Sequence, residues 1–287
     1  MNSLYKSEQG KREILALYDE KLAALGWDYS YQKIQTSFGE SNVIVSGDLS
    51  KPAMILVHGS NGCAPIALEC YANLRKKYAL YAVDVLAQPN KSAETRLSMK
   101  DRSYGKWMHE IIEQLELKDV SLAGFSFGGL VILKSLEYQE ENIQEVFLTA
   151  PAYIVNGNPL KAIFKMFLPM RMYMFSEKKI HLQKFLAELF SEEDKFALAY
   201  LGKVFKYFKM DFNPVPVISQ EAAKKISTPI HLIAAQNDLL FPGEKMLQRA
   251  RKIFPSLKKT LLLEHSKHVP SMENNRRIEK LILENQR

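Results

Sequence analysis

Apolar residues recur along this chain at two spacings, one typical of helices and one typical of strands. Residues 7–25 carry apolar side chains at helical spacing and predict an amphipathic helix. Residues 29–38 and 40–47 have the composition of strands, and Gly39 between them predicts a turn. The chain is therefore expected to begin with one helix and a pair of strands.

From residue 53 onward, short and almost entirely apolar runs alternate with helix-like segments. Strands of this kind are typical of a parallel sheet that helices cover on both faces. The expected fold class is therefore α/β. The predicted strands are residues 53–59, 80–85, 120–125, 145–152, 229–236 and 259–265, and the predicted helices lie near residues 64–77, 103–117, 127–139, 243–254 and 271–285.

The alternation stops between residues 153 and 227, where only helical patterns occur. We therefore expect residues 1–152 and 228–287 to form one core, with residues 153–227 inserted between two strands as an all-helical cap. The insertion has twelve Lys or Arg against seven Asp or Glu, and nine of the fifteen Phe. Its Phe and Met residues either form an adaptable acyl pocket or pack the cap against the core.

Composition narrows the functional classes. The chain has 287 residues, 47% hydrophobic residues and a net charge of +7, but no block of five consecutive basic residues, so nucleic acid is not an expected partner. Two cysteines, Cys63 and Cys70, exclude a disulfide scaffold.

Targeting signals are not apparent in the sequence. We find neither a secretion signal nor an apolar stretch of about 18 residues that could span a membrane, and we expect a cytoplasmic protein. An anionic membrane surface stays open as a second partner for the basic cap.

The segment "GFSFGG", residues 124–129, lies where a predicted buried strand ends and a helix begins. This is the arrangement of a nucleophile elbow, with Ser126 as the nucleophile. Gly124 and Gly128 leave room for a sharp turn, and the start of the helix makes the backbone N–H of Phe127 a candidate oxyanion donor. The alternative is an ordinary serine in a glycine-rich turn.

A second oxyanion donor is expected from "HGSNGC", residues 58–63, which follows the strand at 53–59. A tight turn there would present the backbone N–H of Ser60. The alternative is a plain strand-to-helix loop. His58 is interpreted as a structural residue.

A serine nucleophile needs a base, and the base needs a partner that fixes its tautomer. Among six histidines, His268 is the preferred base, because it lies in the loop after the last strand, whereas His265 lies at the strand terminus. Asp238, on the exit loop of the strand at 229–236, is the preferred acid. Asp84 is the second candidate, and a simple turn aspartate is the alternative for Asp238. The order Ser126, Asp238, His268 is typical of α/β-hydrolases.

These motifs together resemble the α/β-hydrolase superfamily along nearly the whole chain, and less specifically its bacterial carboxylesterase-like members with a helical cap. The matching segments are "LVHGSNG", "YAVDVLAQPNKS", "LAGFSFGG", "AAQNDLLFP" and "HSKHVPSMEN". The resemblance implies a mostly parallel eight-stranded sheet flanked by helices. Two features depart from the family pattern: residues 87–92 contain no glycine, and Lys267 precedes His268.

The resemblance implies a serine hydrolase that cleaves a carboxylic ester, thioester or lactone through an acyl-enzyme, with a small-molecule acyl compound as its substrate. Such a mechanism needs no metal or cofactor. Acyltransferase, haloperoxidase or peptidase activity on the same fold stays open, as does a non-hydrolytic small-ligand-binding protein. The apolar cap favours medium or long acyl chains.

Overall fold

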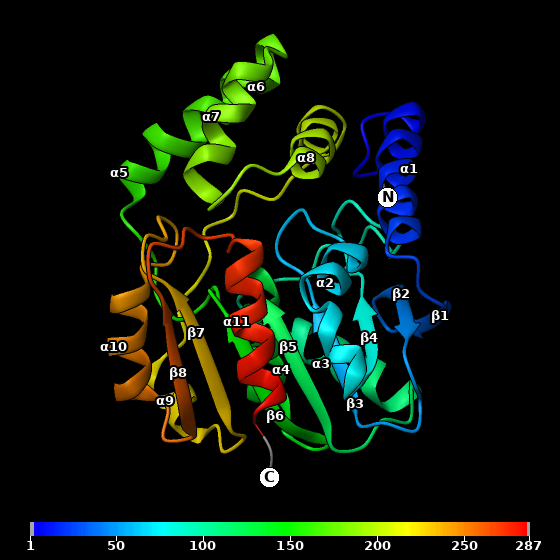
Figure 1. Cartoon of the computed structure of the whole chain (residues 1–287), viewed down its shortest axis with the longest axis vertical. Helices are drawn as coiled ribbons and strands as arrows, with labels where there is room; N and C mark the ends of the chain where they lie inside the picture. The colour runs from blue at the N-terminus through cyan, green and yellow to red at the C-terminus, as the bar shows by residue number, and fades with distance from the viewer. Residues whose placement is uncertain (1–2, 286–287) are drawn as a thin grey trace.

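Eight strands form one twisted sheet at the centre of the molecule, in the order β1-β2-β4-β3-β5-β6-β7-β8 (Figure 1). The computed structural model describes residues 3–285, so residues 1–2 and 286–287 at the ends of the predicted core lie outside it. The strands are β1 (Tyr29–Thr36), β2 (Gly39–Ser46), β3 (Ala53–Val57), β4 (Ala79–Val83), β5 (Val120–Phe125), β6 (Ile143–Thr149), β7 (Ile230–Ala235) and β8 (Leu257–Leu263).

The direction of the strands follows from their connections. β1 and β2 pair antiparallel and are joined by a turn at residues 37–38, one residue before the position expected from the sequence. Gly39 is the first residue of β2 and has a φ of +116°, which favours glycine. β2 also pairs antiparallel with β4, whereas all later neighbours are parallel. The prediction of a mostly parallel eight-stranded sheet is therefore confirmed. β7 is buried along its whole length, because helices cover both of its faces.

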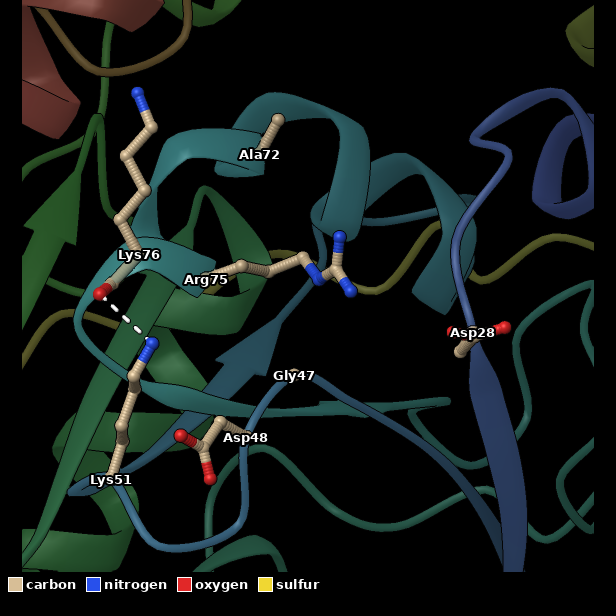
Figure 2. Close-up of a pocket in the computed structure, with 7 residues that line it drawn as sticks. All are labelled: Asp28, Gly47, Asp48, Lys51, Ala72, Arg75 and Lys76. Atoms are coloured by element: carbon tan, nitrogen blue, oxygen red, sulfur yellow. Dashed lines mark hydrogen bonds between the residues drawn. The ribbon is translucent and has the colours of Figure 1, made fainter.

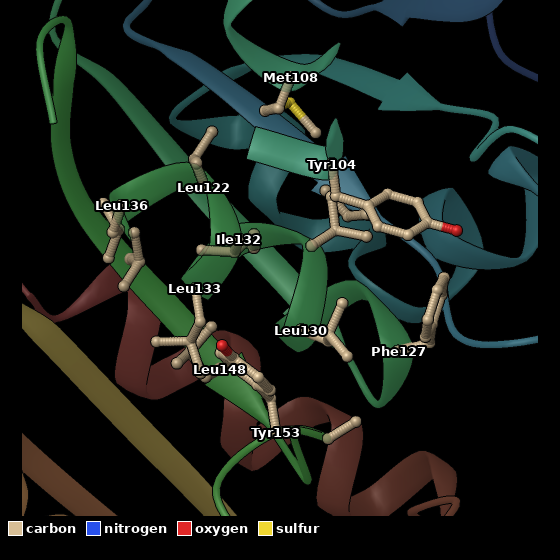
Figure 3. Close-up of a cluster of buried hydrophobic side chains, with 14 of the residues drawn as sticks. Tyr104, Met108, Leu122, Phe127, Leu130, Ile132, Leu133, Leu136, Leu148 and Tyr153 are labelled. Carbon is tan, nitrogen blue, oxygen red and sulfur yellow. The ribbon is translucent and has the colours of Figure 1, made fainter. Parts of the chain in front are cut away.

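Two layers of helices bury two apolar clusters, one on each face of the sheet. α3, α4, α9 and α10 contribute to one cluster, and α1, α2 and α11 contribute to the other. Figure 3 shows the first cluster around α4, where Leu130, Leu133 and Leu148 lie together. The helices are α1 (Glu8–Ala24), α2 (Ala64–Cys70), α3 (Ser103–Gln114), α4 (Phe127–Tyr138), α9 (Gln220–Lys225), α10 (Gly243–Ile253) and α11 (Met272–Leu283).

One predicted helix is interrupted. The segment expected to be a single helix over residues 64–77 consists of α2 and a separate 3₁₀ helix, η1 (Ala72–Lys76). Tyr71 between them has φ −121° and ψ 32°, which is not helical. Its side chain is buried and its hydroxyl donates to Thr149 Oγ1 at 3.4 Å, so tertiary contacts of one residue override the local helical pattern.

Between β6 and β7 the chain forms helices that stand above the carboxyl ends of the central strands (Figure 1). They are α5 (Pro159–Ala162), a π-helical turn, η2 (Ile163–Phe167), α6 (Leu168–Ser176), α7 (Lys179–Leu189) and α8 (Lys195–Tyr207). The last helix of the insertion, α9, packs instead against α4 and α10 beside the sheet. No helix within residues 3–285 is both long and apolar enough to cross a bilayer.

Hydrogen bonds tie the end of α7 to the loop that follows β8. Val269 donates its backbone N–H to the carbonyl of Leu189 at 2.8 Å, and Ser191 donates to the carbonyl of Val269 at 3.0 Å. Lys267 donates from Nζ to the carbonyl of Ala187, in the last turn of α7. A cation at this position also interacts favourably with the helix dipole. Lys267, which departs from the family pattern, therefore joins the loop to the helical insertion.

Candidate active site

Ser126 lies at a strained turn between β5 and α4. Its φ of 53° and ψ of −115° are unfavourable for a residue with a side chain, and strain of this kind persists only when the surroundings hold it. Ser126 donates its backbone N–H to the carbonyl of Thr149 at 3.0 Å, and its carbonyl accepts from the N–H of Ala152 at 2.9 Å. A Cβ on Gly128 would lie 2.2 Å from the carbonyl oxygen of Val57, so the turn requires glycine there.

A chain of hydrogen bonds joins Ser126 to two further predicted residues. His268 Nε2 lies 2.9 Å from Ser126 Oγ, and His268 Nδ1 lies 2.7 Å from Asp238 Oδ2. An ionised carboxylate only accepts hydrogen bonds, so Nδ1–H is the donor to Asp238. In the neutral imidazole, Nε2 is then free to accept the hydroxyl proton of Ser126. This tautomer is the one that a general base requires.

The surroundings fix the carboxylate and exclude water. Asp238 Oδ1 accepts from the backbone N–H groups of Leu240 at 2.8 Å and Phe241 at 3.0 Å. The rings of Phe125 and Phe241 lie against His268, with centroids at 5.0 and 5.5 Å. Ser126, Asp238 and His268 are 7%, 4% and 4% exposed, so their interactions are less screened than they would be in water.

The other five histidines lie elsewhere. His265, the second candidate base, is exposed at a left-handed position with φ 56°. His109 Nε2 bonds to the carbonyl of Gln139, and His231 Nε2 lies 3.1 Å from Glu145 Oε2. His181 lies in α7.

His58 is buried beneath the loop that was expected to hold the oxyanion. Its Nδ1–H donates to the carbonyl of Gly59 at 2.8 Å, and its Nε2 accepts the backbone N–H of Val85 at 3.0 Å. Burial lowers the pKa of His58 to about 4. Its contacts join the end of β3 to the loop after β4, as expected for a structural histidine.

The loop at residues 58–63 runs beside the serine. A Cβ on Gly59 would lie 3.3 Å from Ser126 Cβ, which shows how closely the loop backbone approaches. Phe127 is the first residue of α4, where a backbone N–H has no acceptor within its own helix. Ser60, the other predicted donor, is exposed in the loop.

Gln88 supports this loop, and the sequence interpretation missed its role. Its side-chain Oε1 accepts the backbone N–H of Asn61 at 2.7 Å. Asn61 has a left-handed φ of 56°, so the bond holds a strained residue next to Ser60. The only sequence signal was the unusual, glycine-free segment at 87–92.

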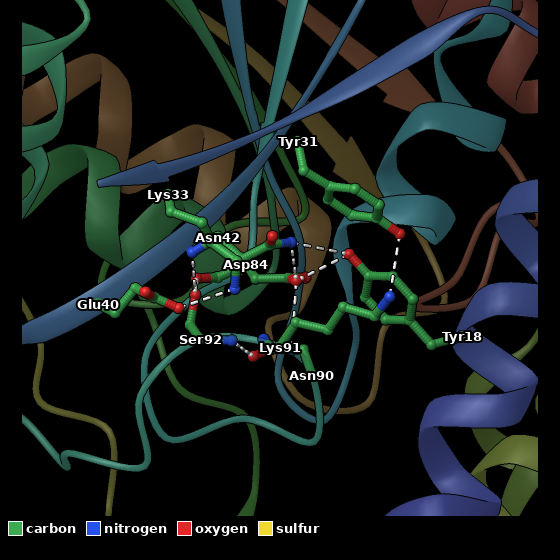
Figure 4. A network of polar contacts seen from close by, with 9 residues as sticks. All are labelled: Tyr18, Tyr31, Lys33, Glu40, Asn42, Asp84, Asn90, Lys91 and Ser92. Atoms are coloured by element: carbon green, nitrogen blue, oxygen red, sulfur yellow. Dashed lines mark hydrogen bonds and ion pairs between the residues drawn. The ribbon is translucent and has the colours of Figure 1, made fainter. Parts of the chain in front are cut away.

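Asp84, the second candidate acid, belongs to a buried polar network rather than to the group around Ser126 (Figure 4). It accepts from Tyr18 Oη at 2.8 Å, from Asn42 Nδ2 at 2.9 Å and from the backbone N–H of Ala64 at 2.8 Å. Burial raises the pKa of Asp84. The carboxyl group therefore joins α1 and β2 to the start of α2, directly after the 58–63 loop.

A surface pocket of about 510 Å³ lies beside η1 and the β2–β3 turn, and neither Ser126, Asp238 nor His268 lines it (Figure 2). Its lining mixes the acidic Asp28 and Asp48 with the basic Lys51, Arg75 and Lys76, and none of them was a predicted site residue. Among residues 3–285, no group of three or more His, Cys, Asp or Glu side chains is arranged to hold a metal ion.

Comparison with known proteins agrees with this architecture. A family model described as "Alpha/beta hydrolase family" matches residues 54–281. The chain belongs to the alpha/beta hydrolase family. The matched region begins in β3 and ends in α11, so it includes every residue of the hydrogen-bonded chain around Ser126.

The chain is similar to carboxylesterases of Bacillus subtilis. It is 24% identical to "Uncharacterized carboxylesterase nap" of strain 168 over 257 residues, which cover 84% of this chain and 81% of that protein. It is 27% identical to "Carboxylesterase YbfK" over 135 residues, 47% of this chain and 46% of that protein. The crystal structure of naproxen esterase (carboxylesterase NP) superposes with a TM-score of 0.83 at 20% identity, covering 96% and 98% of the two chains.

Proposed function

We propose that this alpha/beta hydrolase is a serine carboxylesterase, in which Ser126 is the nucleophile, His268 the general base and Asp238 the acid that orients the base. The observation that chiefly supports the proposal is the unbroken series of contacts from Ser126 Oγ to His268 and on to Asp238, at 2.9 and 2.7 Å. The relatives named as carboxylesterases support ester cleavage as the reaction.

The reaction begins when Ser126 Oγ attacks the acyl carbon and its proton moves to His268 Nε2. The tetrahedral oxyanion accepts hydrogen bonds from the backbone N–H groups of Phe127 and Ser60. The C–O bond to the alcohol then breaks, and the alcohol leaves with the proton from His268. Water then attacks the acyl carbon while His268 Nε2 takes its proton, and that proton passes to Ser126 Oγ as the C–O bond to the serine breaks and the acid leaves.

Residues 153–227 are the insertion in this proposal, and its helices α5 to α8 act as the cap over a core formed by residues 1–152 and 228–287, against which α9 packs. The position of α5 to α8 above the carboxyl ends of the strands supports this division (Figure 1). The hydrogen bonds of Leu189 and Ser191 to Val269, the neighbour of His268, support a direct mechanical link between cap and base. We further propose that the enzyme works in the cytoplasm, where its free thiols, Cys63 and Cys70, stay reduced.

The test is hydrolysis of p-nitrophenyl esters from acetate to laurate, with Ser126→Ala measured alongside. We expect turnover by the wild type and a loss of at least about a thousandfold in the variant. The optimal chain length then gives the size of the acyl site, and a strong preference for acetate would contradict the expected medium or long chain. Undiminished turnover by the variant would exclude Ser126 as the nucleophile.

Labelling with a fluorophosphonate probe distinguishes ester hydrolysis from acyl transfer to another acceptor and from non-hydrolytic ligand binding. Covalent labelling that Ser126→Ala abolishes, without release of acid from any ester, would favour transfer to another acceptor. Neither labelling nor turnover would favour a non-hydrolytic binding protein.

A further inference from the structure

The helix that runs from α5 through η2 to α6 has a row of large apolar side chains on its exposed face. They recur at intervals of three or four residues, which places them along one side of a helix. Phe164 is 67% exposed and Phe175 is 95% exposed. The row, called the cap stripe below, consists of Leu160, Ile163, Phe164, Phe167, Leu168, Met172 and Phe175.

The same helix is anchored by its other face. Ala162, Met166 and Met170 are buried, and the last two belong to the apolar cluster that also contains Leu182 and Phe185 of α7. The helix is therefore apolar on two faces, of which one is covered by the protein. The other face, the cap stripe, is exposed, and of its rings Phe167 lies against Phe212 with the centroids 6.4 Å apart. A row of exposed large apolar side chains on one helix face is a candidate interaction site.

The charges around the cap stripe are almost all positive. Between residues 158 and 184 there is a single acidic residue, Glu177. Among residues 3–285, only Lys165 of the basic side chains there has an ion-pair partner, Glu188. The basic residues in this segment, all exposed, are Lys161, Lys165, Arg171, Lys178, Lys179 and Lys184.

We propose that the cap stripe docks on an anionic phospholipid surface. Phenylalanine and leucine on one helix face, flanked by lysine and arginine, are the composition of helices that lie in a membrane interface. The apolar chains would enter the boundary between headgroups and acyl chains, while the flanking cations contact the phosphates. Cytoplasmic leaflets carry the anionic lipids that such cations bind.

The charge pattern distinguishes this surface from a contact between two copies of the chain. A symmetric contact through the cap stripe would bring two sets of unpaired lysines and arginines together, which repel. The helix that carries the stripe stands at the end of the molecule farthest from the C-terminus (Figure 1). The proposal concerns where the protein binds and does not depend on ester hydrolysis.

Vesicle sedimentation tests the proposal with two lipid compositions, phosphatidylcholine alone and phosphatidylcholine with phosphatidylglycerol. We expect binding to the anionic vesicles that weakens at high salt. Each cation near an anionic surface strengthens binding about fivefold, so Lys161→Gln/Arg171→Gln is expected to weaken binding about 25-fold. Phe164→Ser/Phe175→Ser is expected to weaken it by at least about tenfold. Circular dichroism checks that the variants are folded.

The matched control is Lys258→Gln/Lys259→Gln, which removes two exposed cations from β8, outside the cap. This variant should bind the anionic vesicles like the wild type. Equal losses in the control and in Lys161→Gln/Arg171→Gln would mean that net charge alone drives binding, and would overturn the proposal. So would an absence of binding to either vesicle. A wild-type dimer in analytical ultracentrifugation that Phe164→Ser/Phe175→Ser converts to monomers would instead assign the cap stripe to self-association.

Discussion

The side chain of Gln88 holds the backbone of Asn61, with Oε1 accepting the N–H at 2.7 Å. Asn61 follows Ser60, one of the two proposed oxyanion donors, and has a left-handed φ of 56°. We expect Gln88→Ala to lower kcat about tenfold with little change in KM. The reason is that the loop would lose the contact that orients it, whereas outright loss of an oxyanion donor costs about a hundredfold or more.

The conservative variant Gln88→Glu keeps an acceptor at the same position. Steady-state kinetics on a p-nitrophenyl ester should show that it retains more activity than Gln88→Ala. Equal activity of Gln88→Ala and the wild type would show that the loop holds its conformation without this bond.

Replacement of Asp238 by asparagine should disable the base while preserving the turn. Oδ1 of the new amide still accepts from Leu240 and Phe241, but its NH₂ faces His268 Nδ1. That contact favours the His268 tautomer that carries its proton on Nε2. A protonated Nε2 cannot accept the hydroxyl proton of Ser126. We expect kcat to fall by about four orders of magnitude. A loss smaller than tenfold would mean that another group orients His268.

The sharp turn after Ser126 depends on the absence of a Cβ at residue 128. An alanine there would bring Cβ to 2.2 Å from the Val57 carbonyl oxygen and 2.9 Å from that of His58. Because both neighbours are backbone atoms, we expect Gly128→Ala to lower the free energy of unfolding by about 3 kcal/mol. Denaturant unfolding measures this effect.

Gly26→Ala is the matched control for this steric effect. Nothing lies within 4 Å of a Cβ at Gly26, but its φ is +63°. It should lower the free energy of unfolding by only about 1 kcal/mol, from backbone strain alone. Similar losses in the two variants would contradict a clash at Gly128.

His58 should make the protein less stable in mild acid. Burial lowers its pKa from 6.5 to about 4, so the unfolded chain binds a proton at a higher pH than the folded protein does. The contribution of neutral His58 to the free energy of unfolding is therefore complete above pH 6.5, and it is lost as the pH falls from 6.5 toward 4. This shift corresponds to about 3 kcal/mol of unfolding free energy.

His58→Gln removes the titrating group but keeps an acceptor near the N–H of Val85. Denaturant unfolding at pH 7 and pH 4.5 should show a smaller loss of stability in acid for this variant than for the wild type. The same acid sensitivity in both proteins would assign the effect to other groups.

The sequence predicted the ends of the strands well, and with them the neighbourhood of the site. Ser126, Asp238 and His268 each follow a parallel strand, and the carboxyl ends of parallel strands meet at one edge of a sheet. Their proximity therefore followed from local patterns. The single helix expected over residues 64–77 was wrong because Tyr71 turns its side chain into the interior.

The sequence by itself determined the fold class, since buried apolar strands alternating with helices have few other ways to bury their surface. Tertiary structure alone decided that Gln88, from the loop after β4, supports Asn61. It also decided which apolar face of the helix from α5 to α6 is covered and which is exposed. Local patterns specify secondary structure, but the contacts of a side chain depend on loops and helices from distant parts of the chain, whose positions are set by packing of the whole molecule.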